Sequence, residues 1–383
     1  MRIVSVVGAR PNFMKLAPFS LAVKRHNFSS DHKIEHVIVH TGQHYDTRMS
    51  ENFFRQLDIP EPDINLCVGS GTHAEQVGKT MIEFEKVLRN IQPDWVIVVG
   101  DVNAALAGAV TAKKENIKCC HIEAGLRSGD LSMPEEINRL IIDRISDLLL
   151  TPDVISLNNL IAEGVGLDKI KFVGNIMIDA LEMNRGRASS LDLLKIIEEN
   201  RINQFPEIMK SGFTDFAIVT LHRPSNVDSP LNLSAIAKFL KEEASGNMTI
   251  LWTIHPRTGK ALKELGIWNE LINSENLVLL EPLGYLELLK LNMEAKIVIT
   301  DSGGLQEECT ILGTPCITLR ENTERPVTLS ENGGVSVLTG NDIGKVRVEF
   351  SKAIIKPRKP FRPDLWDGKT AERCLDIILK YNL

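Results

Sequence analysis

The stretch Lys296-Ile297-Val298-Ile299-Thr300-Asp301-Ser302-Gly303-Gly304-Leu305-Gln306-Glu307-Glu308 decides how the rest of the chain is interpreted. Residues 297–299 are apolar and β-branched, which is typical of a buried parallel strand. We expect a helix to begin at Ser302 and to end near Leu312, because a glycine and then a proline follow and stop it. The stretch therefore predicts a strand, a Ser-Gly-Gly turn and a helix.

This turn has the features of an anion-binding site. Gly303 and Gly304 leave no side chain between a ligand and the first free N–H groups of the helix, and the helix dipole favours a phosphate there. Glu308 lies just under two turns into the helix, where a carboxylate can accept hydrogen bonds from the two hydroxyls of a ribose. The alternative is an ordinary N-cap followed by a solvated glutamate, since such short motifs also occur by chance. A nucleoside diphosphate fits both groups at once.

Composition limits the kind of protein. The chain has 383 residues, of which 43% are hydrophobic and 25% charged, and this suits two globular domains. No apolar run reaches the about 18 residues that span a bilayer, and residues 1–8 indicate a strand, so we expect a cytoplasmic protein without a membrane partner. The net charge of −6 argues against nucleic acid as a partner. Six cysteines without zinc-like spacing predict free thiols and no metal site.

Two series of short apolar segments alternate with helical patterns. Alternation of this kind predicts parallel sheets covered by helices on both faces, and so two Rossmann-like, doubly wound α/β domains. The first series comprises residues 3–7, 37–40, 95–99, 118–122, 148–150 and 171–173. The second comprises residues 216–220, 249–254, 277–280, 296–299, 316–319 and 335–338.

The domain boundaries are expected within the helical and loop-like stretch that separates the two series. We predict an N-terminal domain of residues 1–177, joined by a C-terminal helix within 365–383, and a second domain of residues 178–364. The second domain begins with a helical linker, and residues 203–214 have the composition of a loop. Because ligands bind beyond the carboxyl ends of parallel strands, the site is expected in a cleft between the two domains.

Three acids are expected at the carboxyl edge of the first sheet. Asp101 and Glu123 follow consecutive strands, and Glu135 follows a proline at the start of a helix. Repulsion and partial burial should separate the pKa values of the first two and supply one acid and one base. Each alone could be a cap or a favourable first-turn residue. The coincidence of all three favours catalysis.

Basic and imidazole side chains follow other strands. Arg10 and Lys15 leave the first strand and could reach one anion, although a pair of surface cations is an equally common explanation. His222 and His255 each follow a strand of the second sheet, where a histidine can exchange protons or neutralise a diphosphate. Hydrogen bonding that shapes a turn is the alternative, and it suits His255 better. His121, within a strand, is expected to be a packed core residue.

The remaining candidates would complete a nucleotide site. Leu283 lies in a turn after a strand and, with Leu288 in the helix that follows, could flank a flat base; core packing is the alternative for Leu288. Arg325 could close over the anion, or instead form a salt bridge with Glu321 or Glu324.

Taken together, these motifs resemble the non-hydrolysing UDP-N-acetylglucosamine 2-epimerases over nearly the whole chain. The motifs that match are Gly8-Ala9-Arg10-Pro11, Thr41-Gly42-Gln43-His44, Gly100-Asp101, His121-Ile122-Glu123-Ala124-Gly125-Leu126-Arg127, Pro134-Glu135-Glu136-Ile137-Asn138-Arg139, His222-Arg223, 300–308 and Thr323-Glu324-Arg325-Pro326. Hydrolysing relatives typically carry Arg-Ala-Asp-Tyr where this chain has Arg10-Pro11-Asn12-Phe13, which counts against hydrolysis.

The resemblance implies the glycosyltransferase B architecture, often a homodimer, and interconversion of UDP-N-acetylglucosamine and UDP-N-acetylmannosamine through a 2-acetamidoglucal. No cofactor is required, and the partner is a UDP-sugar. The catalytic group would be Asp101, Glu123, Glu135 and His222. By the resemblance, the nucleotide sugar would be held by Arg10, Lys15, Arg139, Ser302, Gly303, Gly304, Glu308 and Arg325. His255, Leu283 and Leu288 complete the predicted substrate site from their own positions in the sequence.

Two other functions fit the same motifs. A related epimerase could act on another UDP-2-acetamido sugar, such as a 2,3-diacetamido glucuronate, because the motifs say little about the far side of the sugar ring. A glycosyltransferase of the same architecture would instead need an acceptor. Architecture alone does not separate these functions.

Overall fold

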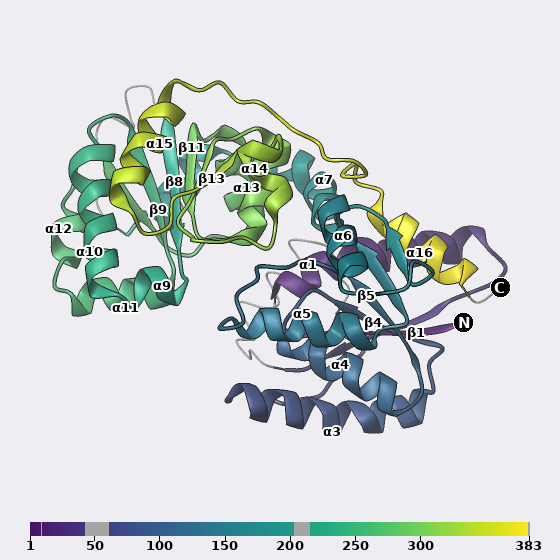
Figure 1. The fold of residues 1–383 in the computed structure, drawn as a ribbon. Helices are drawn as coiled ribbons and strands as arrows, with labels where there is room; N and C mark the ends of the chain where they lie inside the picture. The colour runs from purple at the N-terminus through teal and green to yellow at the C-terminus, as the bar shows by residue number, and fades with distance from the viewer. Residues whose placement is uncertain (9, 43–60, 203–214, 382–383) are drawn as a thin grey trace. The chain divides into compact units, whose positions relative to one another are not determined.

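The computed structural model describes residues 1–8, 10–42, 61–202 and 215–381. The chain folds into two compact units, unit 1 with Met1–Met183 and Pro363–Leu383 and unit 2 with Asn184–Arg362 (Figure 1). The first boundary falls inside the helix α7 (Ile176–Ser189). The second falls in the extended segment between the last two helices, α15 (Ile343–Ile355) and α16 (Thr370–Lys380).

Unit 1 is built on a parallel sheet. Its described strands pair in the order β3-β2-β1-β4-β5-β6-β7. Their bounds are β1 Arg2–Val7, β2 Glu35–His40, β3 Ile64–Asn65, β4 Trp95–Val99, β5 Lys118–Ile122, β6 Leu148–Thr151 and β7 Ile170–Phe172. The strand order reverses between β1 and β4, and ligands of doubly wound sheets bind beyond the carboxyl ends of strands at such a point. The sequence analysis found all of these strands except β3.

Helices cover both faces of this sheet. One face is covered by α3 (His73–Ile91), α4 (Asn103–Lys114) and α5 (Pro134–Ile145), whose apolar residues pack on β1 and β4 (Figure 1). On the other face, α1 (Arg10–Ser29) packs beside α16. The buried Trp366, just before α16, donates from its indole Nε1 to the carbonyl of Pro152 at 2.9 Å. These contacts attach the C-terminal helix to unit 1.

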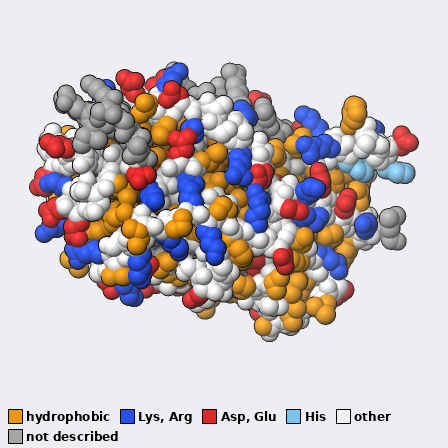
Figure 2. All heavy atoms as spheres, turned by 90° about the horizontal axis from the view of Figure 1, so that it is seen from above, with side chains coloured by type: hydrophobic (Ala, Val, Ile, Leu, Met, Phe, Trp, Pro, Cys, Tyr) orange, Lys and Arg blue, Asp and Glu red, His pale blue; other side chains and the backbone are white. Residues whose placement is uncertain are grey.

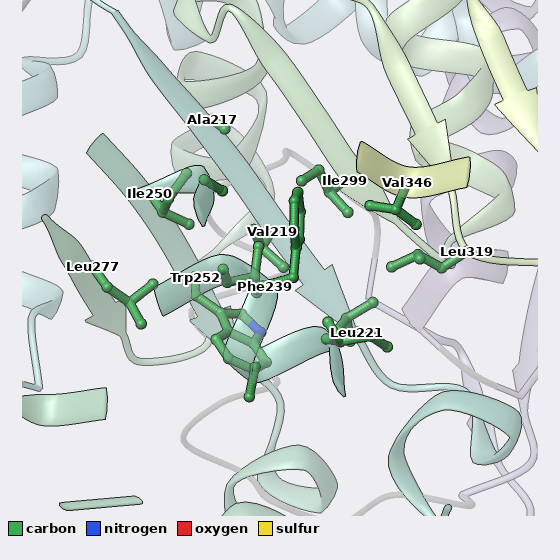
Figure 3. Close-up of a cluster of buried hydrophobic side chains, with 14 of the residues drawn as sticks. Ala217, Val219, Leu221, Phe239, Ile250, Trp252, Leu277, Ile299, Leu319 and Val346 are labelled. Atoms are coloured by element: carbon green, nitrogen blue, oxygen red, sulfur yellow. The ribbon is translucent and has the colours of Figure 1, made fainter. Parts of the chain in front are cut away.

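Unit 2 repeats the plan with strands in the order β10-β9-β8-β11-β12-β13. Their bounds are β8 Phe216–Leu221, β9 Thr249–Ile254, β10 Leu277–Leu280, β11 Ile297–Thr300, β12 Cys316–Thr318 and β13 Ser336–Leu338. Figure 3 shows the core on one face, where Val219 and Leu221 of β8 meet Trp252 of β9 and Phe239 of α10 (Pro230–Phe239). The opposite face carries α13 (Tyr285–Glu294) and α14 (Gly303–Leu312).

The smaller elements complete the two units. They are α6 Val154–Ala162, α8 Leu193–Asn200, α9 Pro224–Val227, the π-helix η2 Leu240–Ala244, α11 Pro256–Glu264, α12 Trp268–Ile272 and the 3₁₀ turns η3 Pro326–Thr328 and η4 Ser330–Asn332. The linker predicted as one helical stretch is two helices, because Asp192 caps α8 by accepting from the N–H of Lys195 at 3.1 Å. The loop predicted at 203–214 lies outside the described residues.

Surface charge and cysteine chemistry can be checked directly. Figure 2 shows lysine and arginine side chains interspersed with acidic and hydrophobic ones over the visible face. All six cysteines are free thiols, as predicted, and all but Cys67 are buried. Among the described residues, the structure contains no helix with the length and apolar character to cross a membrane.

Candidate active site

Glu123 lies at the carboxyl end of β5 and forms an ion pair with Lys15 of α1. The two side chains are only 2% and 9% exposed. Glu123 has a positive φ of 72°, which is unusual for this residue type and is found most often at functional sites. The carbonyl of Leu150 stabilises this turn by accepting from the N–H groups of Glu123 and Ala124, each at 3.1 Å. Lys15 thus contacts a carboxylate that the sequence analysis did not pair with it.

Asp101, after β4, is bound by Arg139 of α5. The Arg139 guanidinium is 2% exposed and also donates from Nε to Glu136 at 2.9 Å. Burial would raise the pKa of Glu136, but N–H groups of the Ser128 loop and the charge of Arg139 hold it below its usual range. Asn138 donates to the backbone carbonyl of Asp101 at 2.8 Å. Asp101 is therefore fixed through both its side chain and its backbone.

Gly100 brings these two acids to one place. It has a positive φ of 67°, and a Cβ atom added to it would lie 3.0 Å from Nζ of Lys15 and 3.3 Å from Oε2 of Glu123. Asp101 is the next residue. The structure thus places Lys15, Asp101 and Glu123 around the carboxyl ends of β4 and β5, as predicted for strand-end side chains. Each of the two acids contacts a buried cation, Asp101 that of Arg139 and Glu123 that of Lys15.

The other sequence candidates of unit 1 differ in placement. Glu135 is exposed on the first turn of α5, and no hydrogen bond or ion pair connects it to another described residue. The buried acid of that turn is Glu136, which the sequence analysis missed although its spacing of three residues from Arg139 is a known helix pairing. The side chain of Arg10 lies outside the described residues. His121 is fully buried, which confirms its prediction as a core residue.

In unit 2, Asp301 organises the loop that carries His222. Asp301 is fully buried and accepts from the N–H groups of His222 at 3.0 Å and Arg223 at 2.9 Å, and from the Asn226 amide at 2.9 Å. Nδ1 of His222 lies 2.9 Å from its other oxygen. Burial would raise the pKa of Asp301, but the bond from His222 and these donors hold it below its usual range. Asp301 was missed as a site residue, although it directly follows the strand β11 (Ile297–Thr300).

The predicted Ser-Gly-Gly turn is present at the start of α14. Ser302 is the N-cap, its side chain makes no capping bond, and α14 begins at Gly303, one residue later than predicted. The helix ends at Leu312, as predicted, and Gly313 has a φ of 76°. A Cβ atom on Gly303 would lie 2.6 Å from Nη1 of Arg325, whereas one on Gly304 would meet nothing within 4 Å. Arg325 therefore lies directly at the N-terminus of this helix.

Arg325 is shared between two carboxylates. It pairs with Glu324, which confirms the salt bridge given as the alternative, and its Nε lies 2.7 Å from Glu307. Glu324 also binds Arg320 at 2.5 Å. Burial would raise the pKa of Glu324, but the charges of Arg325 and Arg320 hold it well below its usual range. The cations at the start of α14 are thus already charge-compensated by acids.

Glu308 is buried rather than solvated, so the solvated alternative is wrong. Burial raises the pKa of Glu308 to about 7, and the polar side chains of Tyr285 and Asn292 nearby offset this only partly. Leu283 and Leu288 pack against the hydrophobic cluster of this face, which confirms the core-packing alternative for Leu288.

His255 lies close to His222 within unit 2, with 5.8 Å between the ring centroids. Its Nδ1 caps α11 by accepting from the N–H of Arg257 at 3.2 Å. Burial and the neighbouring His222 lower the pKa of His255. The turn-shaping role given as its alternative is therefore confirmed, and a substrate-binding role stays a prediction.

Comparison with known proteins gives consistent matches over the chain. The family model described as "UDP-N-acetylglucosamine 2-epimerase" matches residues 26–379. A UDP-N-acetylglucosamine 2-epimerase of Methanocaldococcus jannaschii is 40% identical over 99% of both chains. The crystal structure of the M. jannaschii UDP-GlcNAc 2-epimerase in complex with UDP-GlcNAc and UDP has a TM-score of 0.86 and covers 99% of this chain and 100% of that one, at 40% identity. A UDP-2,3-diacetamido-2,3-dideoxy-D-glucuronate 2-epimerase of Pseudomonas aeruginosa is 37% identical over 92% of this chain and 94% of its own.

Proposed function

This chain belongs to the UDP-N-acetylglucosamine 2-epimerase family, and we propose that it interconverts UDP-N-acetylglucosamine and UDP-N-acetylmannosamine by eliminating and re-adding UDP. The chain is thus an isomerase, and its two doubly wound sheets are those of the glycosyltransferase B architecture. The resemblance inferred from the motifs is confirmed at the level of the family. The substrate, the roles of the residues and the mechanism are the proposal.

The proposed diphosphate site is the start of α14. The first N–H groups of the helix, at Gly303 and Gly304, would bind phosphate oxygens, because helix N-termini favour anions. Ser302 would add its hydroxyl, which makes no capping bond, because its N–H already donates to Oγ1 of Thr300 at 3.0 Å. Arg325 lies beside Gly303 and would add a positive charge by exchanging one of its carboxylate partners for phosphate. Glu308 would accept from the ribose hydroxyls. Leu283 and Leu288 would flank the base.

The proposed chemistry begins with departure of UDP. The hydrogen on the second sugar carbon is hardly acidic, so the leaving group must depart early and give the sugar ring oxocarbenium character, which nearby carboxylates stabilise. Asp101 and Glu123 suit this role because each is held in place by an ion pair with a buried cation, Arg139 and Lys15 respectively. His222, bound to Asp301, would neutralise the departing diphosphate. Glu135 would complete the group if the substrate reaches the first turn of α5.

One observation carries the proposal. Two adjacent strand ends, those of β4 and β5, each deliver a carboxylate paired with a buried cation, and Gly100, next to Asp101, lies against the Lys15–Glu123 pair. An elimination that builds positive charge on a sugar and removes an adjacent proton needs carboxylates that are held in place beside it. A protein that only bound nucleotide sugars would have no need of them.

The test is isotope exchange without added acceptor or nicotinamide. The full chain is incubated with UDP-N-acetylglucosamine in heavy water, and the sugar is followed by NMR and mass spectrometry. The expected result is the manno epimer with deuterium at the second sugar carbon, because the proton returns from a group that exchanges with solvent. Release of free UDP and free sugar would contradict the proposal, since it indicates hydrolysis.

The P. aeruginosa relative supports a second candidate substrate. The same experiment is therefore run with the UDP-2,3-diacetamido-2,3-dideoxy-D-glucuronate named for that protein. Exchange on this sugar alone would keep the elimination mechanism and change the substrate.

We also propose a homodimer from the family resemblance, and light scattering should give twice the chain mass of 42.6 kDa.

A further inference from the structure

A continuous row of buried polar groups lies behind the ends of β4 and β5. Nε2 of His121, in β5, lies 2.9 Å from the carbonyl oxygen of Gly100, and its Nδ1 lies 2.6 Å from Oδ1 of Asp143, in α5. Oδ2 of Asp143 accepts from Nη1 of Arg127 at 2.7 Å and from the N–H of Gly125 at 3.0 Å. The side chains of His121 and Asp143 are 0% and 1% exposed. Neither can therefore touch a substrate.

The hydrogen-bond roles determine the protonation state of His121. A carbonyl oxygen only accepts, so Nε2 must carry a proton that it donates to Gly100. Both of these donors bind Oδ2 of Asp143. Burial would raise the pKa of Asp143, but the charges of His121 and Arg127 hold it below its usual range, so Asp143 is a carboxylate and its Oδ1 also accepts. Nδ1 must then donate as well. His121 is consequently a buried imidazolium paired with Asp143.

This pair connects the backbone segments that carry both acids. Gly100, held through its carbonyl, directly precedes Asp101 and lies against the Lys15–Glu123 pair. Gly125, held through its N–H, lies two residues after Glu123 in the same turn. That turn includes the positive φ of Glu123, a conformation that persists only where surrounding bonds enforce it. One carboxylate thus restrains both strand ends.

We propose that Asp143 and the His121 imidazolium are positioning residues, which set the spacing of Asp101 and Glu123 for the reaction. The inference rests on the proposed function insofar as it takes those two acids as the reacting groups. It adds to that function a pair of residues behind the site that never contact the sugar. Loss of the charge should affect turnover rather than binding, because UDP would be held by unit 2.

The most informative variant is Asp143→Asn. Its amide oxygen can still accept from Gly125 and Arg127, and its amide N–H can donate to Nδ1 of a neutral His121, so each hydrogen bond has a replacement and only the charge is lost. We expect kcat for epimerisation to fall about 10–100-fold, with KM changed by less than about threefold. A rise in KM with an unchanged kcat would overturn the inference.

Asp147→Asn is the matched control. Asp147 likewise binds a cation, Lys113, at 2.8 Å and a backbone N–H, that of Cys119, at 2.8 Å, but at the opposite end of β5. This variant should keep kcat and KM, even if its melting temperature falls. An equal loss of kcat in both variants would show that general destabilisation is responsible, and it would overturn the positioning role.

A spectroscopic measurement tests the imidazolium without relying on activity. In ¹⁵N-histidine-labelled protein at neutral pH, the His121 signals are identified as those missing from His121→Gln. Both ring nitrogens should resonate as protonated in the wild type, and one should become unprotonated in Asp143→Asn. One unprotonated nitrogen in the wild type would overturn this inference alone. A wild-type chain inert toward both UDP-sugars would instead overturn the proposed function, whatever the His121 spectrum shows.

Discussion

The candidate residues of unit 1 and those of unit 2 differ in how their charges are balanced. In unit 1, both acids proposed for the chemistry are ion-paired, Glu123 with Lys15 and Asp101 with Arg139, which also binds Glu136. In unit 2, Arg325 is likewise divided between two carboxylates, but no described lysine or arginine forms an ion pair with the buried Glu308. The acids of unit 1 are therefore fixed by ion pairs, whereas burial raises the pKa of Glu308 to about 7, so that its charge can change with pH.

This difference fits the tasks proposed for the residues of the two units. Groups that stabilise a developing cation work best when they are ionised and held in place before the reaction, since they then need no reorganisation. A site that must bind, release and recapture a diphosphate needs a balance that a ligand can shift, because cations that were uncompensated would bind too tightly to release it. The predictions below test each side of this contrast, beginning with the largest effect.

Glu123→Gln tests the ion-paired acids of unit 1. Glutamine can still accept a hydrogen bond from Lys15, so the fold should survive, but the negative charge beside the sugar is lost. We expect deuterium exchange at the second sugar carbon to fall about 10²–10⁴-fold, while UDP affinity changes little. Exchange is followed by NMR and UDP binding by calorimetry. If exchange continued at the wild-type rate, the ionised pair would not be part of the chemistry.

Glu135→Gln asks whether an acid without a buried cation belongs to the same group. Glu135 is exposed, so its replacement should leave the melting temperature unchanged. If the catalytic role proposed for it is right, exchange should still fall about 100-fold, near the lower end of acid–base contributions. A variant with normal exchange would remove Glu135 from the catalytic group and leave the two cation-paired acids as its carboxylates.

Glu308→Gln tests the buried acid of unit 2 through the pH dependence of stability. Folding raises the pKa of Glu308 from 4.5 to about 7 through burial. Below about pH 4.5 both the folded and the unfolded chain hold this proton; between there and pH 7 only the folded chain keeps it, so wild-type stability falls as pH rises. Relative to the variant, the free energy of unfolding should drop by up to about 3 kcal/mol over this window. Denaturant unfolding from pH 4.5 to 8 measures the difference, and two parallel curves would contradict the burial effect.

The pairing of the acids with cations could not be predicted from the sequence, although many of the strands and helices that carry them could. The bounds of β5, β9 and β10 match the prediction because periodicity and β-branching are local signals, and α14 was recognised from its glycines. The strand β3 was missed because two residues carry no periodicity. Which carboxylate meets which cation depends on tertiary packing: Lys15 and Glu123 are 108 positions apart, and nothing near either residue indicates the other.

Gly303→Ala tests the geometry at the start of α14. The added methyl group would lie 2.6 Å from Arg325 and 2.8 Å from Glu324, so this ion pair must move. We expect the free energy of unfolding to fall by about 1–3 kcal/mol and UDP to bind more weakly. Gly304→Ala is the matched control, because its methyl group meets nothing within 4 Å and alanine favours a helix. Equal stability in the two variants would show that the Arg325 pair adapts without cost.

The smallest effect is expected where the two histidines of unit 2 are compared. Asparagine is a good N-cap, so His255→Asn should keep the start of α11 and the melting temperature, and removal of a ring beside the ligand should raise KM only several-fold, about 1 kcal/mol. His222→Asn should lower kcat more, because His222 is bound to the buried carboxylate of Asp301 and is the group proposed to meet the leaving diphosphate. Steady-state kinetics of the two variants decide the assignment. A larger kcat loss for His255→Asn would assign the catalytic role to His255, which caps α11, and not to His222, which Asp301 holds.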